Sequence, residues 1–108
     1  METEIDALLD GMLSAIQKEA GKNWDRIQGT ARQILKNSKN RLELLTEFRL
    51  NNQITQKEFE SRLEDEKHML EAGLNTLEVL TKVAVQNAAN AAFVVLLKAV
   101  EIALKAGV

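Results

Sequence analysis

The sequence predicts an all-α fold, a long antiparallel helical hairpin that assembles into an oligomeric helical bundle. Apolar residues recur at steps of three and four along most of the 108 residues. No proline interrupts these runs. The stretch at residues 51–55 most densely combines the chemistry that ends one helix and begins the next, and Gly21 and Asn23 offer a weaker combination. We therefore expect a single helical domain over residues 1–108, with helices at 3–20, 23–50 and 56–106 around a turn at 51–55.

The turn carries the densest local signals in the chain. Thr55 is a natural N-cap, and Glu58 stands three residues later, where its carboxylate can reach back to the Thr55 amide. Ile54 and Phe59 flank this pair and predict a hydrophobic staple. Asn52 tolerates the left-handed conformation that closes a helix. These five residues predict that the helices on either side are antiparallel neighbours.

The same stretch, residues 42–63, resembles the SHOCT motif, a short helical hairpin found in bacterial proteins. The resemblance rests on Leu45, Phe48, Asn52, Ile54, Thr55, Glu58, Phe59 and Leu63. The family usually has Gly at the position of Asn52, and an acidic residue at the position of Lys57. The resemblance implies a self-association or docking element, and it assigns no functional residue.

The segment before the turn contains one ambiguous point. Helix 3–20 is amphipathic, and Gly21 could either end it or lie within one helix that continues to residue 50. A continuous helix gives a single long hairpin, whereas a break gives three helices with residues 3–20 folded back. Both arrangements place residues 3–20 against the apolar C-terminal half. Within helix 23–50, Ser38 and Arg41 interrupt the apolar stripe, so we expect polar packing there.

The helix expected at 56–106 carries two apolar stripes from Val79 onward. A helix that is apolar on two faces needs neighbours on both, and the hairpin partner covers only one. We therefore predict a homo-oligomer, a dimer or larger, whose interface is the bulkier stripe. Buried polar residues on this stripe would set the register, as they do in coiled coils. The predicted interface consists of Val83, Gln86, Asn90, Phe93, Leu97, Val100 and Leu104.

Composition argues against several functional classes. Cysteine is absent, which excludes disulfides, thiolate catalysis and cysteine zinc sites. There is no Gly-x-Ser-x-Gly setting or phosphate-binding glycine loop, so we expect no enzyme and no cofactor. The net charge is −2, and the basic segment 22–41 lies across from the acidic segment 58–71, so we expect no nucleic-acid partner.

The location of the protein is inferred from its ends. The acidic start Met1–Glu4 lacks the basic residues of a signal peptide, and a cytoplasmic protein is expected. In the C-terminal half, the uncharged run bounded by Asn87 and Lys98 is too short to cross a bilayer, so a membrane role is not expected.

A metal-binding bundle is the main alternative function. Asp65 and His68 have the spacing of the Glu-x-x-His pair of helical di-iron proteins, and Glu64 lies one turn before the histidine. A surface histidine among helix charges explains the same residues, and no metal ligand is assigned. The preferred function is a non-enzymatic structural or protein-interaction module, and an adaptor or inhibitor with an unidentified protein partner is a further alternative.

Overall fold

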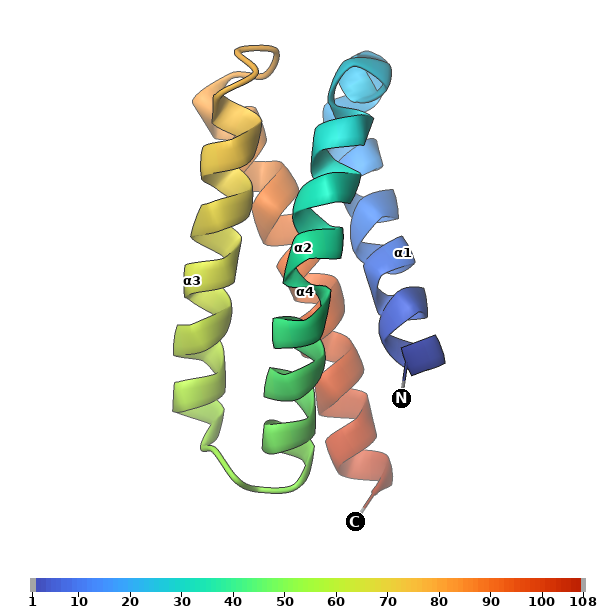
Figure 1. The fold of residues 1–108 in the computed structure, drawn as a ribbon, viewed down its shortest axis with the longest axis vertical. Helices are drawn as coiled ribbons and strands as arrows, with labels where there is room; N and C mark the ends of the chain where they lie inside the picture. The colour runs from blue at the N-terminus through green and yellow to red at the C-terminus, as the bar shows by residue number, and fades with distance from the viewer. Residues whose placement is uncertain (1, 108) are drawn as a thin grey trace.

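The computed structural model describes residues 2–107, with side chains over residues 4–107, and this part of the chain forms four α-helices and one short 3-10 helix. The helices run alternately up and down (Figure 1). Both ends of the chain lie at the same end of the bundle as the turn between α2 and α3. The all-α bundle predicted from the sequence is therefore confirmed. The elements are α1 (Glu2–Ala20), η1 (Gly21–Asn23), α2 (Trp24–Leu50), α3 (Gln56–Asn75) and α4 (Lys82–Ala106).

Each helix packs against two neighbours, so that the four form a ring in chain order. The contact between α1 and α4 is the most extensive, while α2 and α4 meet only slightly across the centre. The apolar stripe of residues 3–20 thus covers the C-terminal helix, as expected. The bundle measures 42 × 24 × 20 Å. Its core contains fully buried side chains from all four helices, among them Ile5, Met12, Ile16, Leu35, Leu42, Phe59, Leu70 and Leu96.

Gly21 ends the first helix, so the single long hairpin is wrong and the alternative with residues 3–20 folded back is correct at this point. Gly21 has φ +55°, a left-handed conformation that glycine adopts without steric cost. One turn of 3-10 helix follows, and the chain then reverses into α2 at Trp24. The reversal allows α1 to pack beside both α2 and α4.

The helix expected at 56–106 is also interrupted, between Asn75 and Lys82. Thr76 donates its hydroxyl hydrogen to the Gly73 carbonyl at 2.6 Å, and Glu78 adopts φ +55°. Thr81 then caps α4 by accepting a hydrogen bond from the Ala84 amide at 3.0 Å. This break was not predicted because the segment from Asn75 to Lys82 contains neither glycine nor proline.

Packing explains why the chain turns here. A continuous helix would carry the apolar segment beyond the other helices, where nothing in the chain could cover it. The reversal instead buries seven apolar side chains of α4, each of which contributes up to about 1.5–3 kcal/mol if large. Interrupting the helix sacrifices only a few hydrogen bonds, at about 1 kcal/mol net each. Leu77, Val79 and Leu80 of the connecting loop also pack onto the core.

Candidate interaction surface

The predicted turn has the expected geometry. The Thr55 amide donates to Glu58 at 2.9 Å, and the Glu58 amide donates to the Thr55 hydroxyl at 3.0 Å, which together form a capping box. The Thr55 amide, and then its hydroxyl, hold the pKa of Glu58 below its ordinary value of 4.5. Asn52 has φ +57°, Phe59 is buried and Ile54 is half-buried. These residues stabilise the turn, and the polar groups of the capping box bond to one another. The turn is therefore a structural element.

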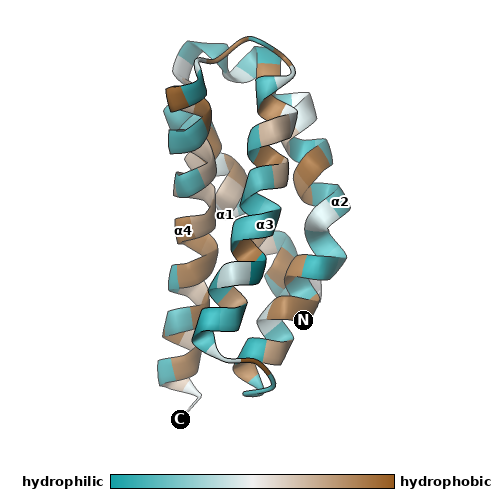
Figure 2. Ribbon diagram, turned by 90° about the vertical axis from the view of Figure 1, so that its left-hand side faces the viewer, coloured by the Kyte–Doolittle hydropathy of each residue, from teal (hydrophilic) through white to brown (hydrophobic). Residues whose placement is uncertain are grey.

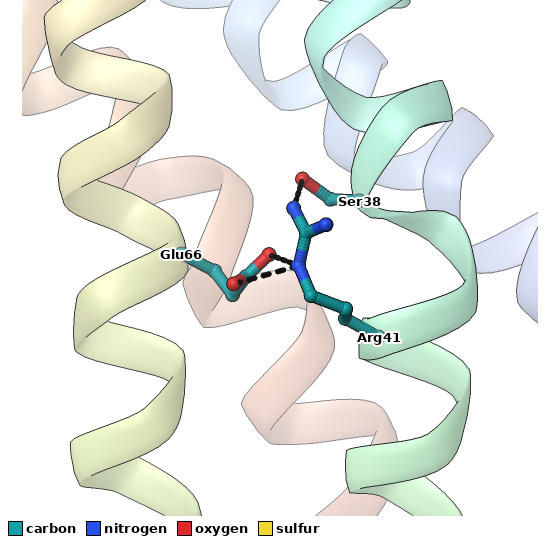
Figure 3. A network of polar contacts seen from close by, with 3 residues as sticks. All are labelled: Ser38, Arg41 and Glu66. Carbon is teal, nitrogen blue, oxygen red and sulfur yellow. Dashed lines mark hydrogen bonds and ion pairs between the residues drawn. The ribbon is translucent and has the colours of Figure 1, made fainter.

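The polar interruption of the α2 stripe is a small network between two helices (Figure 3). Arg41 Nε donates to both carboxylate oxygens of Glu66 at 3.1 Å, and its guanidinium also reaches the hydroxyl of buried Ser38 at 3.3 Å. Glu66 is almost fully buried, so Arg41 supplies the charge that this carboxylate needs. Lys39 forms an ion pair with Asp6 of α1 at 2.9 Å. Both contacts hold helices together, and neither forms an open charged site.

The structure buries some residues of the predicted oligomer interface and leaves others exposed. Phe93 and Val100 are buried, because α4 lies between α1 and α3 and both of its flanks are covered within one chain. Their assignment to an open interface is therefore wrong. Leu97 and Leu104 are half-buried and pack against the core. The inference from two apolar stripes to two neighbours was sound, but both neighbours belong to the same chain.

The other three predicted interface residues are exposed: Val83, Gln86 and Asn90. Asn90 Oδ1 accepts a hydrogen bond from Lys67 of α3 at 2.8 Å. Its partner is thus in the same chain, and it does not act as the buried register residue of a coiled coil.

The outward side of α4 nevertheless carries apolar residues among polar ones, and hydrophobic residues recur along the whole helix (Figure 2). Among the described residues, five large hydrophobic side chains are exposed, and three of them are Val83, Val94 and Ile102. Half-buried Ala91 lies between them, and no charged residue occurs from Val83 to Leu97. We call the surface made by Val83, Asn87, Ala91, Val94, Lys98, Glu101 and Ile102 the α4 outer face.

Val94 was not identified from the sequence because the predicted stripe ran from Val83 through Gln86 and Asn90, and not through Asn87 and Ala91. Val83 and Val94 are eleven residues apart, as are Ala91 and Ile102. Eleven residues make almost exactly three helical turns, so such spacing keeps residues on one side of a straight helix. A search at this period would have found the α4 outer face.

A second surface lies between α2 and α3, beside the turn. A groove of about 340 Å³ is lined by the apolar side chains of Leu44, Leu45, Phe48 and Ile54. Its charged lining residues are Arg41, Glu58, Arg62, Asp65 and Glu66. Leu44 is 49% exposed and is accessible from solvent.

A third hollow, of about 170 Å³, lies among α1, α2 and α4 near the ends of the chain. Its walls are mostly apolar and include Ile5, Leu8 and Val100. Thr46 is 3% exposed there, and its hydroxyl has no hydrogen-bond partner among the described residues. The hydroxyl is a local cost to stability.

The alternative metal ligands do not converge. His68 is exposed, with Nε2 at 3.4 Å from Glu64 and 3.9 Å from Glu71, both on its own helix. Asp65 instead lines the groove beside α2. In the described part of the chain, no group of three or more acidic or histidine side chains is placed to hold a metal ion. The geometry gives the metal-binding alternative no support.

Over residues 2–107, one helix, α4, is long and apolar enough to cross a membrane by length and composition alone. This differs from the expectation based on the shorter uncharged run, because an 18-residue window within Lys82–Ala106 has a mean hydropathy of 1.5. The core helix of a water-soluble bundle meets the same test, and α4 packs against both α1 and α3.

Comparison of the chain with protein-family models, curated proteins and solved structures gives no match, so the SHOCT resemblance of residues 42–63 stays a prediction.

Proposed function

We propose that the protein is a non-enzymatic helical-bundle module that self-associates through the α4 outer face. The single observation that carries the proposal is the alignment of Val83, Val94 and Ile102 on one outward side of α4. Isolated exposed apolar residues are common, but several large ones aligned on one face of a helix indicate an interaction site. The absence of charge from Val83 to Leu97 lowers the cost of removing the first part of this face, up to Val94, from water.

The proposal keeps the C-terminal helix as the interface but moves the contact to another face of it. Buried Phe93 is unsuitable for a test, because Phe93→Asp would unfold the bundle whether or not copies associate. Val94 is 44% exposed and can be changed without entering the core. Leu44 on α2 is exposed to a similar degree, at 49%, and provides a matched control.

The experiment compares wild type, Val94→Asp and Leu44→Asp by light scattering after size exclusion, across a dilution series. We expect a wild-type dimer, a Val94→Asp monomer and a Leu44→Asp dimer. Circular dichroism verifies that both variants remain helical. A wild-type protein that is monomeric at every concentration, or a folded Val94→Asp protein that remains dimeric, contradicts the proposal.

A second candidate function is docking of an unrelated protein in the groove between α2 and α3. The observation that favours it is the exposed Leu44 in a groove whose lining combines further apolar side chains with charges of both signs. Such a groove suits the apolar face of an amphipathic helix. Here Leu44→Asp would abolish retention of the partner and Val94→Asp would not, the reverse of the pattern expected for self-association.

A further inference from the structure

Apart from Glu101, the residues of the α4 outer face are arranged in pairs about its midpoint, between Ala92 and Phe93. Val83 and Ile102 lie equally far from this point, on opposite sides of it. Ala91 and Val94 are equally close to it. When two such helices pack antiparallel about this midpoint, each of these residues faces the other member of its pair. A two-fold interface requires this self-complementarity, because residue i contacts residue j and j contacts i.

Side-chain size fits the same arrangement. Near the two-fold axis, the small side chain of Ala91 faces the larger Val94, and the relation repeats on the other side of the axis. Alternation of small and large residues across facing positions lets two helices approach to about 8–10 Å. At each end of the interface, Val83 of one copy covers Ile102 of the other. These two residues are the most exposed large apolar residues on the helix.

Charge selects antiparallel over parallel packing. In the antiparallel arrangement, Lys98 faces the uncharged Asn87 of the other copy. Glu101 lies level with the uncharged Ala84 of the other copy. In a parallel pair in register, Lys98 would face Lys98 and Glu101 would face Glu101. Like charges held side by side are destabilising, so the charges oppose the parallel pairing.

We propose that two copies of the chain pair through their α4 outer faces as an antiparallel, two-fold dimer centred between Ala92 and Phe93. This inference rests on the proposed self-association and specifies its partner and register. The contact follows one helix on each copy, of about 37 Å at 1.5 Å per residue. Such a contact lies at the low end of specific interfaces, and we expect micromolar rather than nanomolar dissociation.

The chain contains no cysteine, so single cysteines report on register directly. Val83→Cys and Ile102→Cys are made separately, then mixed and treated at high micromolar concentration with a short bismaleimide linker. In the antiparallel dimer, the two Val83 positions are about 28 Å apart at 1.5 Å per residue, beyond the reach of such a linker. Intact mass spectrometry distinguishes the mixed product from the two self-linked products. Leu44→Cys, with an exposed thiol on another face, gives the background of random collision.

The expected result is a mixed Val83→Cys/Ile102→Cys product at least several-fold above the Leu44→Cys background, with little self-linking of either variant. Dominant self-linking would show a parallel pair and overturn this inference while leaving the proposed function intact. The wild type could also form a dimer that Val94→Asp dissociates while neither the mixed nor a self-linked product appears. That result would show another register and would also overturn this inference. A wild-type monomer at every concentration would remove both proposals together.

Discussion

Replacing Thr46 with valine is expected to stabilise the protein. Thr46 is buried at the end of α2 where α1 and α4 meet, and its hydroxyl has no hydrogen-bond partner among the described residues. Valine has nearly the same shape, so the substitution exchanges a hydroxyl for a methyl group without opening a cavity. The two residues also have similar helix propensities. The change in stability therefore reports on the hydroxyl itself.

The size of the expected gain in stability follows from the surroundings of the Thr46 hydroxyl. An unpaired hydroxyl costs about 1–3 kcal/mol on burial by protein mutational data. Thr46 is 3% exposed, so water cannot compensate from outside. We expect Thr46→Val to raise the free energy of unfolding by about 1 kcal/mol, and Tm by about 4 °C for a domain of this size.

The measurement is urea unfolding followed by circular dichroism, with fluorescence of Trp24 as a second probe of two-state behaviour. Protein concentration is held constant, because association would shift the midpoint. Thr81→Val is the matched control. It removes the N-cap that accepts from the Ala84 amide, and it should cost about 1 kcal/mol. A Thr46→Val protein that is no more stable than wild type would refute the reasoning, since the hydroxyl must then have a partner.

Three further predictions concern stability. Gly29→Ala should stabilise by about 0.5–1 kcal/mol in urea unfolding, because a Cβ there meets no atom within 4 Å and alanine favours the helix. Arg41→Ala should destabilise by about 1–2 kcal/mol, since Glu66 stays buried without its cation, and the loss should largely vanish in a Glu66→Met background. The hydrogen bonds with Thr55 lower the pKa of Glu58 in the folded state. The stability that they contribute is therefore complete above pH 4.5 and is lost as pH falls below it. Glu58→Gln should flatten that acid limb in pH-dependent melting, and an unchanged limb would contradict the assignment.

Local chemistry made the turn predictable. Asn52, Thr55 and Glu58 act on neighbours within three residues, so their spacing alone specifies the capping box and the left-handed closure. The polar contact at Ser38 and Arg41 was predictable for the same reason, as an interruption of a regular stripe. Its partner, Glu66, was not, because the pairing depends on how α3 lies against α2.

The break between α3 and α4 shows the limit of this reasoning. Helix propensity and the absence of glycine and proline favour continuation through Leu77, whereas burial of the α4 side chains favours reversal. The second effect is several times larger, but it exists only when α1 is in place to receive α4. A sequence pattern shows that a residue is apolar and does not show which neighbour covers it.

The prediction of the interface had the same limit, because the sequence pattern did not show which neighbours cover the C-terminal helix. The sequence alone determined the helical class, the chemistry of the turn and the need of the C-terminal helix for neighbours on more than one side, because these depend on periodicity and local contacts. Tertiary structure decided the number of helices and buried Phe93 and Val100 inside one chain. It also left Val83, Val94 and Ile102 outside. Burial depends on how the helices pack together. The exposed face of α4 could therefore be located only from the positions of α1 and α3 beside it.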